Sequence, residues 1–130
     1  MAVYVDTSAL LKLVISEQET PALHEFLEGS VSTIVSSDLA RTEVIRAVRR
    51  GASEQVVRAR AVLDALTLLS LTTETFEAAG RLDPSILRSL DALHLAVALS
   101  LGDDLEAVIT YDARLAEACR ANGVAVLAPR

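Results

Sequence analysis

Short apolar runs alternate along the chain with longer stretches in which apolar and polar residues recur at helical spacing. The short runs are rich in aliphatic residues and are bounded by serine, aspartate or glycine, which is typical of strands. We predict five strands, at Ala2–Val5, Val31–Val35, Leu68–Leu71, Ala107–Thr110 and Val124–Leu127.

The longer stretches predict helices, because capping residues precede them and glycine or proline follows several of them. Strands that are joined by helices favour a parallel sheet covered on both faces. We therefore predict one domain over residues 1–130, an α/β protein with a three-layer α/β/α sandwich around a central, mainly parallel sheet. The expected helices run from a cap at Thr7 or Ser8 to about Ser16, over Pro21–Gly29, from a cap at Asp38 to Gly51, from Ser53 to about Leu66, from Thr73 to about Leu82, over Leu87–Gly102, and from a cap at Asp112 to about Asn122.

The composition supports a buried core and excludes several kinds of site. Hydrophobic residues make up 52% of the chain, which is enough for a core, whereas aromatic residues make up 3%, too few for a base-stacking platform. The only lysine, Lys12, does not lie in a G-K-[ST] phosphate loop, and no G-x-G-x-x-G dinucleotide motif is present. One cysteine, Cys119, forms neither an intrachain disulfide nor a cysteine-based zinc site.

The chain shows no sign of export or of membrane insertion. Residues 1–6 lack the basic region of a signal peptide, and Arg88, Asp91 and His94 interrupt the most apolar stretch. We therefore expect a protein of the reducing cytoplasm with no membrane partner.

Charge is unevenly distributed. The net charge of −6 argues against a protein that coats nucleic acid without specificity. Residues 41–60 nevertheless carry six arginines against two glutamates. These arginines either cover solvated helix faces or form a cationic ridge for phosphates, and the candidates for RNA contact are Arg46, Arg49 and Arg50.

Two aspartates directly follow predicted strands. Asp6 comes after the first strand, and Asp112 follows Thr110 and Tyr111 at the end of a later one. Ligands of open parallel sheets bind outside the carboxyl ends of the strands, so both carboxylates are expected at the same edge. Helix capping is the simpler explanation for an aspartate at either position.

Two further acids fall inside predicted helices, on the faces that should be buried. Asp91 shares a face with Leu87, Leu95 and His94, and Glu43 lies between Leu39 and Ala47 at four-residue spacing. An unpaired buried carboxylate is costly, so a positive group should meet each acid. For Glu43, a local ion pair with Arg46 or Arg50 is an alternative to a metal.

Together the four acids predict a site for a divalent cation. Mg²⁺ and Mn²⁺ prefer oxygen ligands, activate water and neutralise phosphate, which makes metal-assisted phosphodiester hydrolysis the leading reaction class. Thr7, Ser8 and Thr110 are candidates to orient a water molecule or a phosphate. His94 is interpreted first as a core histidine bonded to Asp91 or a neighbour, and only second as a catalytic group.

These residues also form recognisable motifs. The chain resembles the PIN-domain ribonuclease toxins of bacterial type II toxin–antitoxin systems, the VapC-like proteins, over essentially its whole length. The resemblance implies a PIN-like α/β/α sandwich, an acidic quartet at Asp6, Glu43, Asp91 and Asp112, and a following hydroxyl at Thr7 or Ser8. The matching segments are Val3–Leu10, Arg41–Val44, Leu90–Ala96, Thr110–Ala116 and Gly123–Val126.

The resemblance further implies cleavage of single-stranded RNA with Mg²⁺ or Mn²⁺ centred on Asp6 and Asp91. It also implies a homodimer that a cognate antitoxin protein inhibits. A mean hydropathy of +0.39 is in keeping with apolar surface that another chain covers.

Two other functions stay open at this point. One is a small phosphatase or phosphotransfer domain phosphorylated on Asp6, which the missing late lysine and the missing D-x-D motif disfavour. The other is a non-catalytic binding module whose acids accept arginines of a partner.

Overall fold

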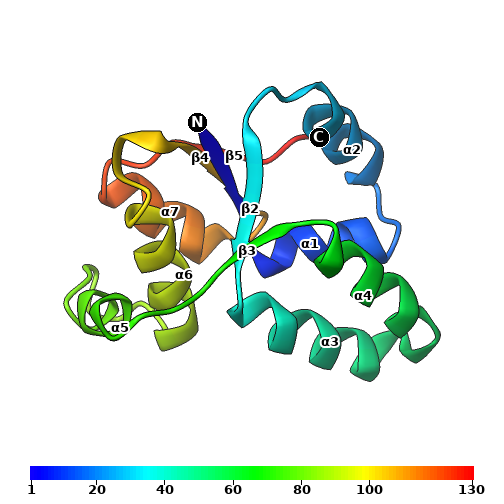
Figure 1. Ribbon diagram of the computed structural model, residues 1–130, viewed down its shortest axis with the longest axis horizontal. Coiled ribbons are helices and arrows are strands. Elements are labelled where there is room, and N and C mark those ends of the chain that lie inside the picture. The colour runs from blue at the N-terminus through cyan, green and yellow to red at the C-terminus, as the bar shows by residue number, and fades with distance from the viewer.

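The computed structural model describes residues 1–130 and places a five-stranded parallel sheet at the centre of the molecule (Figure 1). The order of the strands across the sheet is β3-β2-β1-β4-β5. The predicted parallel sheet is therefore confirmed. The strands are β1 (Ala2–Val5), β2 (Thr33–Ser37), β3 (Thr67–Leu69), β4 (Leu105–Ile109) and β5 (Val126–Leu127).

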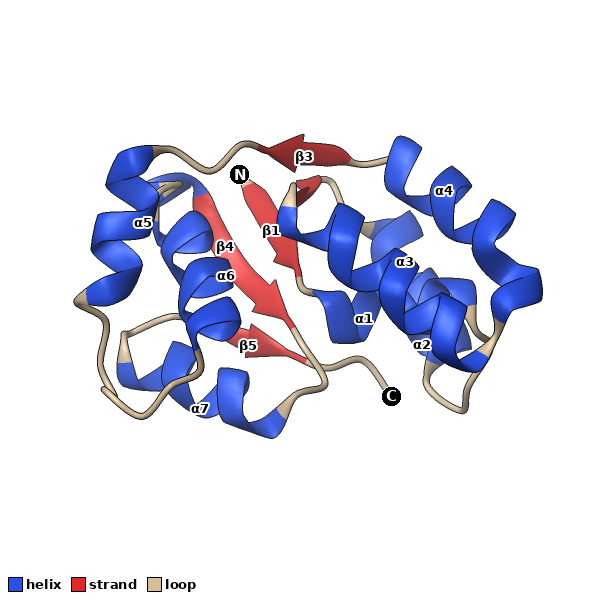
Figure 2. Cartoon of the chain, turned by 90° about the horizontal axis from the view of Figure 1, so that it is seen from below, coloured by secondary structure: helices blue, strands red, loops and turns tan.

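Each connection between consecutive strands contains one or two helices, and the helices cover both faces of the sheet (Figure 2). Two short 3₁₀ turns, Ser53–Gln55 and Gly102–Asp104, precede α4 and β4. The helices are α1 (Thr7–Val14), α2 (Thr20–Gly29), α3 (Leu39–Gly51), α4 (Val56–Asp64), α5 (Thr73–Gly80), α6 (Ser89–Leu99) and α7 (Ala113–Ala121).

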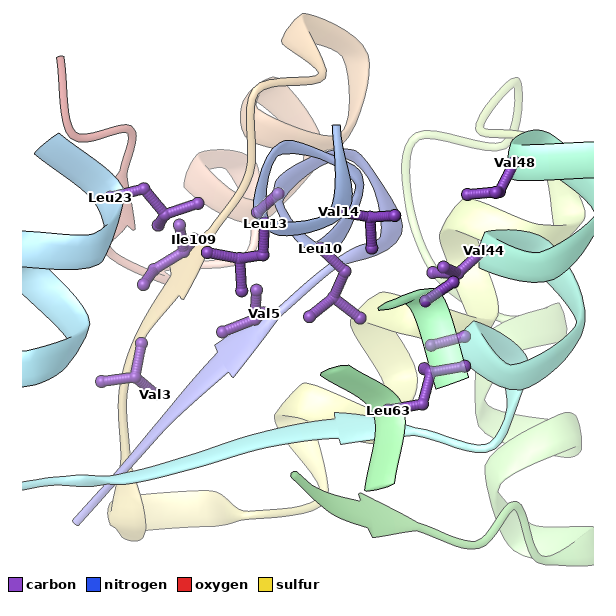
Figure 3. Close-up of a cluster of buried hydrophobic side chains, with 13 residues drawn as sticks. Val3, Val5, Leu10, Leu13, Val14, Leu23, Val44, Val48, Leu63 and Ile109 are labelled. Carbon is purple, nitrogen blue, oxygen red and sulfur yellow. The ribbon is translucent and has the colours of Figure 1, made fainter. Parts of the chain in front are cut away.

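The central strand β1 divides the core into two layers because its side chains alternate between the two faces. Val3 and Val5 join a cluster with residues of α1 to α4, which Figure 3 shows with Leu10 and Ile109. Ala2 and Tyr4 join a second cluster with residues of α6 and α7. A third, small cluster joins α5 to α6. The predicted three-layer sandwich is confirmed.

The order in which strands are added to the sheet changes side at β1. The strands β2 and β3 lie on one side of β1, whereas β4 and β5 lie on the other. Val5 is in register with Ile109, and the backbone N–H of Asp6 donates to the carbonyl of Ile109. The residues that follow β1 and β4 therefore meet at a topological switch point, where open α/β sheets bind their ligands.

Several predicted element boundaries are shifted. The strand predicted at Val31–Val35 is β2, Thr33–Ser37, because Ser36 and Ser37 are buried and hydrogen-bonded while Val31 is fully exposed. The strand predicted at Ala107–Thr110 is β4, which begins at Leu105 and ends at Ile109. The third and fifth predicted strands are shorter than expected, since β3 ends at Leu69 and β5 has two residues.

The predicted helix caps are partly wrong. The cap of α1 is Asp6, as the alternative explanation for this aspartate predicts, and not Thr7 or Ser8, because the Asp6 side chain accepts from the backbone N–H of Ala9. Asp38 makes no capping bond and instead pairs with Arg41. The predicted cap at Asp112 is confirmed.

Three predicted helices have different ends. The helix expected from Ser53 opens with a 3₁₀ turn before α4, and α1 ends at Val14. The helix expected from Leu87 begins at Ser89, because Leu87 closes a turn onto Pro84 and Arg88 is extended. None of the helices is long and apolar enough to cross a membrane.

Candidate active site

Asp6 lies at the end of β1 with 4% of its surface exposed. Its Oδ1 accepts from the hydroxyl of Ser8 at 2.7 Å and from the backbone N–H of Ala9 at 3.0 Å. Its Oδ2 accepts only one bond, from the hydroxyl of Thr110 at 2.5 Å. Burial raises the pKa of Asp6, although these three bonds and the charge of His94 oppose the shift. The carboxylate is therefore held rigidly in an environment that favours a nearby cation.

Glu43 lies on α3, and its side chain reaches the same edge of the sheet. Its Oε1 accepts from the hydroxyl of Thr7 at 2.9 Å and from Nε2 of His94 at 2.5 Å. Burial acts to raise the pKa of Glu43, but the bond and charge of His94 and the bond from Thr7 hold it below its usual range. No bond occupies Oε2. Glu43 is thus anchored through Oε1, and its Oε2 remains available to a ligand.

Behind Glu43, a buried chain of polar groups reaches into the sheet. His94 lies on α6 with 3% of its surface exposed, and its Nδ1 is 2.6 Å from the hydroxyl of Tyr4 on β1. Tyr4 in turn donates to the hydroxyl of Ser37 at 2.9 Å. Every buried side-chain polar atom has a partner, so the chain of bonds is fully satisfied.

Asp91 and Asp112 complete the acidic edge. The Oδ1 of Asp112 caps α7 by accepting from the backbone N–H groups of Arg114 and Leu115, and its Oδ2 accepts nothing. Asp91, in the first turn of α6, makes no side-chain hydrogen bond. Burial raises the pKa of Asp91, and the negative charges of Asp112, Asp6 and Glu43 add to the effect while His94 opposes it.

The structure therefore brings the four predicted acids to one edge of the sheet, close enough for three of them to act on the fourth. It does not assemble a ready-made metal cluster, because no three His, Cys, Asp or Glu side chains lie close enough to hold an ion together. Of the predicted hydroxyls, Ser8 and Thr110 orient Asp6, and Thr7 orients Glu43.

Two local pairings considered from the sequence do not form. Glu43 pairs with His94, not with Arg46 or Arg50. His94 bonds to Tyr4 and Glu43, not to Asp91. The three candidate RNA-contact arginines, Arg46, Arg49 and Arg50, are exposed on α3 and make no ion pair, so they stay predictions.

Sequence reasoning missed Tyr4 and Ser37. The hydropathy pattern treats Tyr4 as one of the apolar residues of the strand Ala2–Val5, and it ends the second strand at Val35, before Ser37. Tyrosine usually finds a hydrogen-bond partner when it is buried, so its place in a fully buried strand was the available signal.

Comparison with known proteins identifies the family of the chain. The family model described as PIN domain matches residues 3–121. The chain belongs to the PIN-domain family. Ribonuclease VapC47 of Mycobacterium tuberculosis is 44% identical over 131 residues, covering 98% of this chain and 96% of that protein. Ribonuclease VapC46 of the same species is 42% identical over 128 residues, covering 98% of each. The predicted resemblance to VapC-like PIN toxins is confirmed.

Solved structures share the fold at low sequence identity. Mycobacterium tuberculosis VapC20, described as a Sarcin-Ricin loop cleaving toxin, superposes with a TM-score of 0.77 at 19% identity, covering 98% of this chain and 99% of that one. A toxin–antitoxin complex from Klebsiella pneumoniae gives a TM-score of 0.74 at 21% identity, covering 100% and 98%. PIN-domain ribonucleases in general depend on a divalent metal ion.

Proposed function

We propose that this PIN-domain protein is an endoribonuclease toxin that hydrolyses RNA phosphodiester bonds with Mg²⁺ or Mn²⁺ held by its acids. The supporting observation is the acidic edge, at which the charges of Asp6, Glu43 and Asp112 all act on Asp91. Such mutual repulsion is relieved by a counter-charge, and a hard divalent cation fits four carboxylates. The names of the VapC relatives support RNA as the substrate.

The pattern of hydrogen bonds fits a metal site. Three of the acids are anchored through one oxygen that accepts two bonds, Oδ1 of Asp6, Oε1 of Glu43 and Oδ1 of Asp112. The other oxygen of each keeps lone-pair capacity, and Asp91 keeps all of its own. Mg²⁺ is commonly held by one or two carboxylates together with water and substrate phosphate, so a ready-made cluster of three ligands is not required.

We propose that Asp6 and Asp91 are the principal ligands and that Glu43 and Asp112 complete the site. When bound, the ion would offset the charge of the phosphate and lower the pKa of water. Ser8, Thr110 and the N–H of Ala9 hold the Asp6 carboxylate in one orientation. A carboxylate fixed in this way binds its ligand without reorganisation, which is the main route to efficient catalysis.

Glu43 is placed to orient a water molecule or the substrate through a hydrogen bond. Its pKa is held low, so it is ionised at neutral pH and can accept a hydrogen bond from water or substrate through Oε2. His94 and Thr7 fix its orientation from behind. We therefore assign His94 a positioning role through Glu43.

The test is cleavage of structured RNA by the purified protein with Mg²⁺ or Mn²⁺. We expect Asp6→Ala and Asp91→Ala to lower the rate at least about a hundredfold. The matched control is Asp103→Ala, which removes an exposed carboxylate at the opposite, amino-terminal edge of β4. Variants of Asp6 and Asp91 that cut as fast as the parent would overturn the proposed site, and calorimetry without divalent-ion binding would favour a non-catalytic module.

We also propose an antitoxin protein as inhibitor, a homodimer as the assembly and the cytoplasm as the location. The toxin–antitoxin complex among the structural neighbours supports a partner of this kind. Large apolar side chains on the surface support a covered face, among them Phe76 with 55% and Leu90 with 48% of their surfaces exposed.

A further inference from the structure

A cleft of about 500 Å³ opens directly beside the acidic edge, with Asp91 in its wall. It lies between the start of α6, the segment before it and α7, and its size is within the range of ligand pockets. Its lining combines two arginines, two acids and an apolar side. The residues are Pro84, Ile86, Leu87, Arg88, Asp91, Arg114, Glu117 and Ala118.

Both arginines of the cleft are free to bind an anion. Arg88 and Arg114 are exposed, and neither forms an ion pair, although Asp91 and Glu117 line the same cleft. Guanidinium groups grip phosphate in a bidentate manner. The two arginines are therefore available to phosphate groups at the mouth of the acidic site.

The backbone fixes both arginines next to the acids. Arg88 is the extended residue just before α6, three positions ahead of Asp91. Arg114 is the second residue of α7, and its N–H bonds to the carboxylate of Asp112. Arg88 thus lies near Asp91 at the start of α6, and Arg114 lies near Asp112 at the start of α7.

An apolar wall adjoins the two arginines of the cleft. Ile86 is 88% exposed, and it lies with Pro84 and Leu87 in the same cleft as the arginines. Unstacked bases of single-stranded RNA stack on aromatic side chains and on guanidinium planes. In a chain with so few aromatic residues, arginine is the group that remains for such stacking.

We propose that Arg88 and Arg114 bind the phosphates next to the scissile bond and position single-stranded RNA in this cleft, an inference that rests on the proposed ribonuclease function. The chain carries a net charge of −6, so two cations next to Asp91 give the strand a defined path toward the acidic edge. Both arginines are positioning residues, and the chemistry stays with the acids.

The experiment compares Arg88→Ala, Arg114→Ala and the double variant with the parent. Binding of a short, fluorescein-labelled single-stranded RNA of mixed sequence is followed by fluorescence anisotropy in EDTA, over a range of salt concentrations. The control is Arg120→Ala, which removes an exposed, unpaired arginine of the same helix α7 outside the cleft.

We expect each cleft variant to bind RNA roughly threefold to tenfold more weakly. The slope of log Kd against log salt should fall by about 0.7 for each arginine removed. Arg114→Lys should keep the salt slope but not the full affinity, since lysine lacks the bidentate fork. With metal present, KM for RNA should rise more than kcat falls.

Unchanged RNA affinity of the cleft variants would overturn the inference, as would a parent protein that does not bind this RNA. Loss of antitoxin binding with RNA binding intact would also overturn it and would assign the arginines to the protein partner. A parent that binds RNA through the cleft but does not cut it would refute the proposed function and leave the cleft assignment standing.

Discussion

The hydroxyl of Tyr4 lies 2.6 Å from Nδ1 of His94, and the two rings form a T-shaped pair with an interplanar angle of 72°. Tyr4 belongs to the central strand, whereas His94 belongs to a helix on one face of the sheet. The pair ties the orientation of the imidazole to the most rigid part of the fold. Because Nε2 of His94 bonds to Glu43, the sheet indirectly sets the position of an acid in the candidate site.

Tyr4→Phe tests this connection. The change removes the hydroxyl bonds to His94 and Ser37, and we expect a loss of stability on the order of 1 kcal/mol. Because groups that orient a ligand from behind are typically worth ten- to a hundredfold, we expect kcat to fall at least about tenfold with a smaller change in KM. Urea unfolding and single-turnover RNA cleavage measure the two effects.

Tyr111→Phe is the matched control, since its hydroxyl donates to the carbonyl of Pro129 and touches no acid. It should cost similar stability but leave kcat unchanged. Nitrogen chemical shifts of the His94 ring should change in Tyr4→Phe only. A Tyr4→Phe protein with parental kcat and an unchanged His94 signal would contradict the connection.

The sequence was sufficient for the layers of the fold because alternating strands and helices constrain the topology strongly. The sequence was less reliable for the ends of helices and strands, for example the end of β2. Ser36 donates to the carbonyl of Val5 and Ser37 accepts from Tyr4, so both serines are buried inside a strand that a hydropathy pattern ends at Val35. Those partners come from the neighbouring strand, which a local pattern does not contain.

The candidate site likewise contains some residues that a local sequence pattern predicts and others that it does not. Asp6 and Asp112 could be predicted because strand ends and helix caps are local features. The partner of Glu43 could not, since His94 lies 51 positions further along the chain, while two arginines stood at helical spacing nearby. The cleft arginines Arg88 and Arg114 carry no local signal, because only the packing of α6 against α7 brings them together.

Asp6→Asn should stabilise the metal-free protein while abolishing RNA cleavage. A carboxyl group whose pKa is raised by folding contributes stability at low pH that is lost as pH rises through the folded pKa, so its ionised form is unfavourable at pH 7. The amide keeps the bonds from Ser8 and Ala9 to Oδ1. Thermal unfolding in EDTA should show a Tm raised by a few degrees at pH 7 and little difference near pH 3.

Asp103→Asn serves as the comparison, because it removes an exposed charge and should leave Tm almost unchanged. A lower Tm for Asp6→Asn at pH 7 would show that its hydrogen bonds outweigh the burial of its charge.

Phe76→Asp should convert the proposed homodimer to a monomer. Phe76 is 55% exposed on α5, and an interface that buries such a side chain does not accept an unpaired carboxylate. Val57→Asp, on α4 and 81% exposed, is the control for an apolar surface residue at a different place. Light scattering with size-exclusion chromatography gives the mass of each protein. A parent that is already monomeric would refute the dimer, and a dimeric Phe76→Asp would exclude this face.

Glu43→Gln should destabilise the protein in a way that depends on pH. A carboxyl group whose pKa is lowered by folding contributes stability above its unfolded pKa, and that stability is lost as pH falls through the folded pKa. The charged bond with His94 is partly buried, with 24% of the Glu43 side chain exposed, so we expect the parent to be more stable by about 1–2 kcal/mol at pH 7. The difference should vanish below the ordinary glutamate range. Urea unfolding at several pH values measures it, with the exposed Glu54→Gln as a control that shows no such trend. A difference that persists at low pH would mean that Glu43 acts through its shape and not through its charge.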